Sequence, residues 1–164
     1  SVSVKAIRAG LEQAYLPGRQ ELVTLRGINI YLDVAHNADS AWALFHYIKR
    51  QNTNQSICSV FSCLNTKDIA SMTAPFLELV THWYIASLDH INAASLDEIL
   101  PILSVPESVF SCDTVEYAFT AALSQAEVEK DACIMVYGSF HTVAVIKRYL
   151  AKHFKEEIGY ERTI

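Results

Sequence analysis

The sequence has little charge gathered in one place. Its 164 residues include 13 Lys and Arg against 18 Asp and Glu, which gives a formal net charge of -5. The longest positive groupings are Lys49 with Arg50 and Lys147 with Arg148, and both pairs are expected to be solvated side chains at the ends or outer faces of helices. Because backbone binding to nucleic acid needs clustered Lys and Arg, nucleic acid is not an expected partner.

Long apolar runs and metal-type cysteine spacings are also missing. No stretch approaches the roughly 20 apolar residues of a membrane helix, and the chain does not open with a basic region followed by an apolar one. The four cysteines lie in apolar segments without CxxC spacing or a histidine at metal-ligand intervals. We therefore expect buried thiols in a reducing cytosol, a cytoplasmic protein without a membrane partner, and no metal ligands on this chain.

The common phosphate-loop and nucleophile motifs are absent as well. The chain contains neither GxxxxGK[ST] nor GxGxxG, so it carries no complete nucleotide-triphosphate site. The segment Gly138-Ser139-Phe140-His141 lacks the second glycine of the GxSxG elbow, and nucleophilic catalysis has little support.

The composition is that of one globular domain. The chain is 51% hydrophobic and 19% charged, and at this length folding should bury roughly 70% of the surface that the unfolded chain exposes. We expect a single domain over residues 1–164.

Hydrophobic periodicity predicts alternating strands and helices. The expected strands are 21–25, 28–33, 56–61, 81–86, 109–112 and 132–137, the first two forming a hairpin. The expected helices are 3–14, 39–50, 67–79, 96–103, 114–125 and 142–154, with a loosely held tail over 156–164. This order predicts an α/β, Rossmann-like three-layer domain, with a mostly parallel sheet of about six strands flanked by helices.

Two polar loops stand where the carboxyl ends of such strands would place a ligand. The first loop begins at Asp33, directly after the apolar run 28–32. In it, Asp33 offers a carboxylate to a ribose or metal ion, His36 a proton donor to a phosphate, and Asn37 an orienting amide. Taken alone, the loop is more simply explained as a strand end, a helix cap at Asn37 or Asp39, and an exposed His36.

The second loop is Tyr137-Gly138-Ser139-Phe140-His141-Thr142. Gly138 permits a tight turn, while Ser139 and Thr142 place hydroxyls near a helix start, which suits a carboxylate or phosphate. The simpler alternative is an ordinary helix cap with His141 on the surface.

Two weaker candidates are Arg19, which follows the turn Pro17-Gly18, and the segment Asn65-Thr66-Lys67-Asp68, for which a Thr66 cap is the default explanation.

Together these loops resemble the C-terminal domain of the Mur ligase superfamily, and within it the folylpolyglutamate synthase and dihydrofolate synthase family. The resemblance spans most of the chain and rests on Leu16-Pro17-Gly18-Arg19, Leu32-Asp33-Val34-Ala35-His36-Asn37, Lys67-Asp68 and Tyr137-Gly138-Ser139-Phe140-His141-Thr142-Val143. It implies a monomeric ATP- and Mg²⁺-dependent ligase that joins L-glutamate to dihydropteroate or folate through an acyl phosphate. It also implies an N-terminal ATP-binding domain of the same polypeptide, absent from this chain, that carries the metal ligands. The isolated chain is then expected to be inactive.

The same resemblance implies roles for single residues. Arg19, Asp33, His36 and Asn37 would contact ATP, with His36 near the phosphates as the catalytic candidate, and Ser139 and His141 would lie at the glutamate site. Ala38 stands where the family often has proline, and Asn65 where some relatives have histidine.

Two other functions stay open. One is a stand-alone module that binds a nucleotide or acidic metabolite, and the other is a Mur-type amino-acid ligase with a non-folate acceptor.

Overall fold

Seven strands form one sheet in the computed structural model, which describes residues 2–13, 16–51, 55–103, 108–129 and 131–161. Across the sheet the strands run in the order β5-β4-β3-β6-β2-β1-β7. Their bounds are β1 Glu21–Leu25, β2 Ile28–Leu32, β3 Ser56–Phe61, β4 His82–Ala86, β5 Val109–Cys112, β6 Ala132–Tyr137 and β7 Ile158–Glu161. The five strands from β5 to β2 are parallel, and β1 pairs antiparallel with both β2 and β7.

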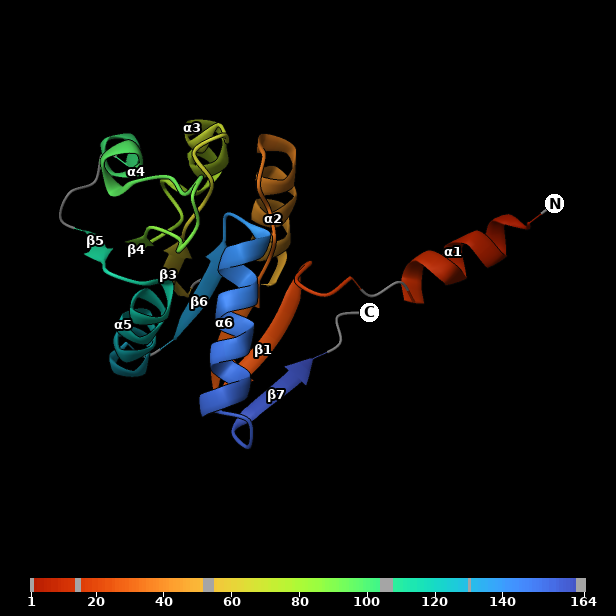
Figure 1. Cartoon of the computed structure of the whole chain (residues 1–164). Helices are drawn as coiled ribbons and strands as arrows, with labels where there is room; N and C mark the ends of the chain where they lie inside the picture. Colours follow the sequence, from red (N-terminus) through yellow and green to blue (C-terminus); the bar gives the residue numbers. More distant parts are fainter. Residues whose placement is uncertain (1, 14–15, 52–54, 104–107, 130, 162–164) are drawn as a thin grey trace.

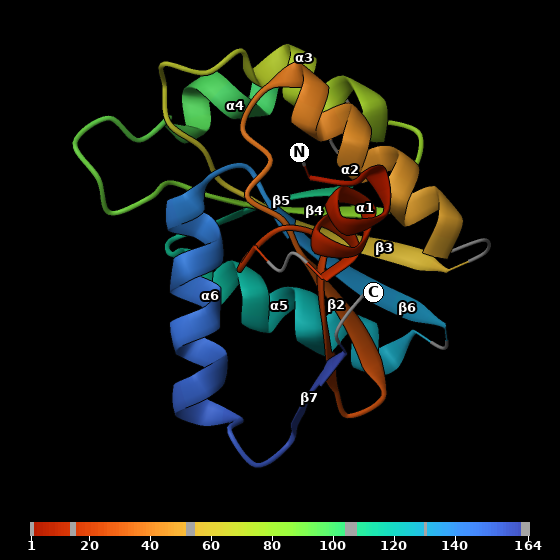
Figure 2. The same cartoon turned by 90° about the vertical axis from the view of Figure 1, so that its right-hand side faces the viewer.

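Helices cover both faces of this sheet and make three layers (Figures 1 and 2). One face carries α5 and α6, and the other carries α2, α3, the short 3₁₀ helix η1 and α4. The bounds are α2 Ala38–Gln51, α3 Ile69–Thr73, η1 Ala74–Phe76, α4 Leu96–Leu103, α5 Val115–Val128 and α6 Phe140–His153. The Rossmann-like α/β prediction is therefore confirmed.

The central strands are apolar on both faces, as expected of a parallel sheet between two helical layers. In β6, Ile134 packs into the core beneath α5 and α6, while its neighbour Met135 packs into the core beneath α2 and α3. Both are fully buried. This two-sided burial fixes the register of β6 between β2 and β3.

The topology brings several loops to one edge of the sheet. The carboxyl ends of the five parallel strands lie at that edge, and so does the start of β1, because Glu21 pairs with Leu32 at the end of β2. The chain also reverses direction across the sheet there, since β3 leads outward to β4 and β5 before β6 returns to the other side of β3. Such switch points are where open α/β sheets bind ligands.

The structure corrects three predicted elements. The helix expected over 67–79 is only α3 followed by η1, because Pro75 cannot donate a backbone hydrogen bond, and its cap is Asp68 instead of Thr66. The helix expected over 114–125 is α5, which begins at Val115 after its cap Thr114 and continues to Val128. The tail expected to be loose contains β7, a seventh strand that pairs with β1.

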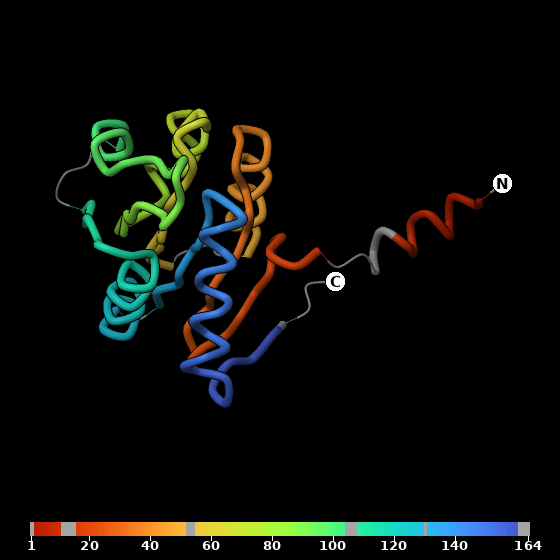
Figure 3. Tube along the Cα trace, viewed as in Figure 1, coloured from red at the N-terminus to blue at the C-terminus, as the bar shows by residue number. Residues whose placement is uncertain are grey.

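The first helix, α1 (Val4–Gln13), stands clear of the sheet and its covering helices (Figure 3). The apolar side chains of Val4 and Ile7 are exposed on it. The predicted helix end at residue 14 lies outside the described residues. None of the described helices is both long and apolar enough to cross a membrane.

Candidate functional site

The polar loop after β2 lies against the start of α6, because β2 and β6 are parallel neighbours whose ends are aligned. Leu32 pairs with Val136, and the amide of Asp33 continues that ladder by donating to the Val136 carbonyl at 3.0 Å. The amide of Gly138 donates to the Ala35 carbonyl at 3.1 Å. Two segments a hundred residues apart in the sequence are thus joined by backbone hydrogen bonds.

Asp33 is a buried carboxylate at this junction, with 3% of its surface exposed. Its Oδ2 accepts a hydrogen bond from the Gln20 amide at 2.9 Å. Its Oδ1 lies 3.7 Å from Arg19 Nη1, which is close enough for attraction but too long for a hydrogen bond, so this oxygen has no hydrogen-bond partner among the described residues. Burial raises the pKa of Asp33, against the opposing effects of the Gln20 amide, the Arg19 charge and the Ala35 amide.

A buried acceptor without a donor is rare in folded proteins and is a place where a ligand can bind. The half-exposed guanidinium of Arg19 stands beside it, with its charge available to an anion. Carboxylate and guanidinium together can therefore hold a polyol hydroxyl and a phosphate, respectively.

The loop that carries Arg19 is fixed by Glu21 and Lys147, which belong to none of the sequence motifs. The Gly18 amide donates to Glu21 Oε2 at 2.8 Å, and the Gly18 carbonyl accepts from the Val34 amide at 2.7 Å. Glu21 is buried, and both of its carboxylate oxygens bind Lys147 Nζ, at 2.7 and 2.8 Å. The prediction that Lys147 is a solvated surface residue was therefore wrong.

A signal for this pair was present in the sequence. Lys147 falls beside the apolar stripe Val143, Ile146 and Leu150 of α6, so its stem had to cross buried surface. The buried partner Glu21, however, lies 126 residues away.

His36 is held with a defined tautomer. Its Nδ1 lies 2.9 Å from the Val34 carbonyl, and because a carbonyl only accepts, Nδ1 carries the proton. Within the described part of the chain, Nε2 has no hydrogen-bond partner. The ring packs against the exposed ring of Phe140, with centroids 5.6 Å apart. His36 thus presents Nε2 at the edge where Asp33 and α6 meet.

Asn37 caps α2. Its Oδ1 accepts from the Ser40 amide at 2.9 Å and from the Ser40 hydroxyl at 2.7 Å. The Ser40 hydroxyl oxygen in turn accepts from the His36 amide at 3.0 Å. The simpler explanation of Asn37 as a cap is therefore correct for its oxygen, and the capping box orients the backbone of His36.

Ser139 caps α6 and is buried, with 4% of its surface exposed. Its Oγ accepts from the Thr142 amide at 3.0 Å and lies 2.8 Å from the Thr142 hydroxyl, which itself donates to the Ser62 carbonyl at 2.6 Å. Since the Thr142 proton is used on Ser62, the Ser139 proton points to Thr142. The helix also begins earlier than predicted, at Phe140 instead of residue 142.

The amides of Phe140 and His141 in the first turn of α6 have no acceptor among the described residues. The His141 side chain is exposed and packs on His90, with ring centroids 4.8 Å apart, so it turns to a different neighbour from that of Phe140. The site thus brings Arg19, Asp33, His36 and Asn37 beside the start of α6, while the His141 imidazole lies outside this group.

This arrangement coincides with a known family. A model of the Mur ligase glutamate ligase domain matches residues 18–140, three quarters of the chain. The chain belongs to the Mur ligase glutamate ligase domain family.

Relatives of this glutamate ligase domain are whole synthases. The dihydrofolate synthase/folylpolyglutamate synthase of Escherichia coli (strain K12) is 36% identical over 143 residues, which are 87% of this chain and 32% of that protein. Escherichia coli FolC in complex with DHPP and ADP has a TM-score of 0.80 at 33% identity, over 93% of this chain and 35% of that one. A bifunctional folylpolyglutamate synthase/dihydrofolate synthase with Mn, AMPPNP and L-glutamate bound has a TM-score of 0.78 at 33% identity, over 92% and 35%. The chain thus spans about a third of the length of these relatives.

The cysteines of the glutamate ligase domain take no part in the site. Cys58, Cys63, Cys112 and Cys133 are all buried and free. Burial raises the pKa of Cys58 and of Cys63 to about 12, which keeps both thiols protonated and poorly nucleophilic. Among the described residues, no three His, Cys, Asp or Glu side chains lie close enough together to hold a metal ion.

Proposed function

We propose that this chain is the C-terminal domain of an ATP-dependent acid–amino-acid ligase that adds L-glutamate to dihydropteroate, to folates, or to both. In the complete enzyme, ATP converts the acceptor carboxylate to an acyl phosphate, and the glutamate amine displaces phosphate to form the amide. The chain contributes one side of the site, and an ATP-binding domain of the same polypeptide contributes the rest, including the Mg²⁺ ligands. We expect this enzyme to act as a monomer in the cytoplasm.

The buried Asp33 carboxylate carries the proposal. One of its oxygens lacks a donor among the described residues, and a ribose hydroxyl is a neutral donor of suitable size for it. Such a bond would also favour the ionised form of a carboxyl group whose pKa is raised by burial. The ADP in the Escherichia coli relative supports the choice of a nucleotide.

Arg19 and His36 would then face the phosphates. The Arg19 side chain is 38% exposed, and its Nη1 lies 3.7 Å from Asp33 Oδ1, which attracts the guanidinium toward the nucleotide side. With Nδ1–H bound to the Val34 carbonyl, His36 can donate to a ligand only through a protonated Nε2, the ring nitrogen without a partner among the described residues. Both groups would stabilise charge on the transferring phosphoryl group, His36 as the catalytic candidate. Asn37 keeps its side-chain NH₂ for the nucleotide, since its oxygen caps α2.

The start of α6 would hold glutamate. The Ser139 hydroxyl is engaged with Thr142, so we assign it the role of fixing the helix start, while the free amides of Phe140 and His141 face a substrate carboxylate. His141 thus contributes through its backbone, because its imidazole turns to His90. The relative with bound L-glutamate supports this choice of amino acid.

The nucleotide assignment is tested on the complete polypeptide with Asp33→Asn. The amide keeps an acceptor for the Gln20 amide but cannot offer an anionic oxygen to ribose, so the KM for ATP should rise about tenfold while the KM for L-glutamate stays within twofold. Asp97→Asn, an exposed carboxylate in the first turn of α4, is the matched control. An unchanged KM for ATP in the folded Asp33→Asn enzyme would overturn the assignment.

The glutamate assignment is tested with Ser139→Ala in the same polypeptide. Losing the cap should loosen the first turn of α6 and raise the KM for L-glutamate about fivefold, with a smaller change for ATP. Thr114→Ala removes the corresponding cap from α5, where Thr114 accepts from the Tyr117 amide at 3.1 Å, and should leave both KM values unchanged. Equal effects of the two variants on glutamate would mean that Ser139 matters for folding alone.

A further inference from the structure

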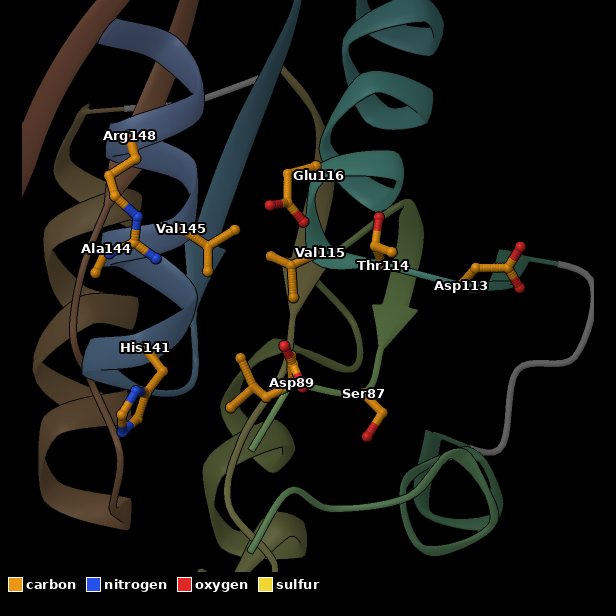
Figure 4. Close-up of a pocket in the computed structure, with 11 residues that line it drawn as sticks. Ser87, Asp89, Asp113, Thr114, Val115, Glu116, His141, Ala144, Val145 and Arg148 are labelled. Atoms are coloured by element: carbon orange, nitrogen blue, oxygen red, sulfur yellow. The ribbon is translucent and has the colours of Figure 1, made fainter. Parts of the chain in front are cut away.

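A cavity of about 560 Å³ lies between the start of α5 and the first half of α6, away from Asp33. Its walls come from α6, from the first turn of α5, and from the loops that follow β4 and β5 (Figure 4). These strands stand on the far side of β3 and β6 from β2, so the cavity lies beside the Asp33 site and shares only α6, including His141, with the start of α6 described above. Its volume falls within the range of small-molecule sites.

The charges around this cavity are divided between two walls. Arg148 lies on the α6 wall, while Glu116 of α5 and Asp89 of the loop after β4 turn their carboxylates toward the space between the helices (Figure 4). Within the described residues, none of these three side chains forms an ion pair. The opposed charges therefore stand more than 4 Å apart across the cavity, too far to neutralise each other directly.

The cavity also has an apolar lining between its charged walls. Leu88 and Val115 line it and are buried. Val145 points toward it from α6 (Figure 4). A ligand that fits must therefore carry a positive end, a negative end and an apolar body.

We propose that this cavity is a second ligand site that binds a neutral, zwitterionic amino acid with an apolar side chain. The ammonium group faces Glu116 and Asp89, the carboxylate faces Arg148, and the side chain lies on Leu88, Val115 and Val145. The inference does not depend on the proposed ligase activity.

The balance of charge sets the preference for a neutral amino acid. Asp113 also lines the cavity but turns its carboxylate away from α6 (Figure 4), so the two carboxylates of Glu116 and Asp89 stand against one guanidinium, with His141 at the α6 side. A second carboxylate on the ligand, as in L-glutamate, would meet this excess of negative charge. L-leucine should therefore bind more tightly than L-glutamate, the opposite order from that expected at the start of α6.

The test is an amide NMR titration of this 164-residue chain with L-leucine. Shifts are expected at residues 87–89, 114–116 and 141–148, and L-leucine should bind at least about fivefold more tightly than acetate, methylammonium or L-glutamate. Arg148→Gln and Glu116→Gln should each weaken L-leucine about tenfold, and Arg148→Lys about threefold at most. The matched controls Arg50→Gln and Asp97→Asn change exposed charges on α2 and α4 and should leave the affinity unchanged.

Three results would overturn the proposal. One is the absence of shifts at the cavity residues, and another is equal binding of L-leucine and its single-charge fragments. The third is tighter binding of L-glutamate at these residues, which would assign the cavity to an anionic ligand. None of these outcomes bears on the ATP kinetics of Asp33→Asn, so the two proposals fail separately.

Discussion

Asp33 should make the stability of the domain fall as pH rises. Burial raises its folded-state pKa above the unfolded value of about 3.9, so between the two values the folded state binds more protons than the unfolded state. The free energy of unfolding then decreases by up to about 1.4 kcal/mol per pH unit across that window, and the full loss remains at higher pH. Urea unfolding of the wild type and of Asp33→Asn from about pH 3.5 to pH 7 measures the effect.

The difference between the two proteins isolates this residue, because every other group titrates in both. We expect Asp33→Asn to gain stability relative to the wild type as pH rises through the window, with no further change above it. A difference that shrinks or stays flat with rising pH would show that the Asp33 carboxylate is already compensated in the folded domain.

Gly138 is required by two separate constraints. Its φ is +118°, a region that L side chains rarely adopt, and an added Cβ would collide with the Ser62 carbonyl oxygen and the Phe61 ring. Since the Gly138 amide also bonds the Ala35 carbonyl, the backbone has little freedom to move away. Gly138→Ala should therefore lower the free energy of unfolding by about 3 kcal/mol or more, measured by urea unfolding.

Substitutions of two other glycines separate the cost of backbone strain from the cost of the steric collision. Gly27 has a φ of +81° but open space for a Cβ, so Gly27→Ala should cost about 1 kcal/mol from backbone strain alone. Gly159 has open space without a positive φ, and Gly159→Ala should change stability by less than about 0.5 kcal/mol. If Gly138→Ala cost no more than Gly27→Ala, the collision with Ser62 would be relieved by movement of the loop.

At the scale of elements, sequence patterns located most of the strands. The bounds 56–61, 109–112 and 132–137 agree with the structure, because each is a short apolar run between polar or turn residues. The hydrophobic pattern did not predict a strand that forms only through tertiary contacts. β7 has exposed Gly159 and Tyr160 and no apolar alternation, so only its pairing with β1 makes it a strand.

β7 protects one edge of the sheet. It covers the outer edge of β1, with Thr24 opposite Gly159 and Leu25 opposite Ile158. Ending the chain at Lys155 should expose that edge, and the β1 amides should exchange with solvent at least about tenfold faster, as followed by hydrogen exchange. The β3 amides are an internal control, since β3 pairs with β4 and β6 and should keep its protection. Equal acceleration in β3 and β1 would mean that β7 stabilises the whole domain instead of one edge.

At the scale of the whole molecule, the sequence predicted that both polar loops follow strand ends, but not that these two loops meet. The contact between the Asp33 loop and the start of α6 requires β2 and β6 to be parallel neighbours, a strand order that hydrophobic periodicity does not give. Sequence spacing does not encode the side-chain distances on which the roles of these groups depend. Examples are the burial of Asp33, the hydrogen bond between Ser139 and Thr142, and the Glu21–Lys147 pair.

What the chain can do alone depends on how much of the ligand site it carries. Asp33, Arg19 and His36 lie along one edge of the sheet, and the chain spans about a third of the relatives that it matches. An open edge supplies only part of the contacts of a bound nucleotide and leaves an acyl phosphate exposed to water. We therefore expect the isolated chain to bind ATP at least about 100-fold more weakly than the complete polypeptide, by calorimetry.

The isolated chain should also form no amide product from ATP, dihydropteroate and L-glutamate with Mg²⁺. If its residual ATP binding occurs at the proposed site, Asp33→Asn should weaken it further and Asp97→Asn should not, which separates a partial site from nonspecific binding. Turnover by the isolated chain would mean that this edge of the sheet is a complete catalytic site. Affinity equal to that of the complete polypeptide, without turnover, is the result expected of a stand-alone binding module.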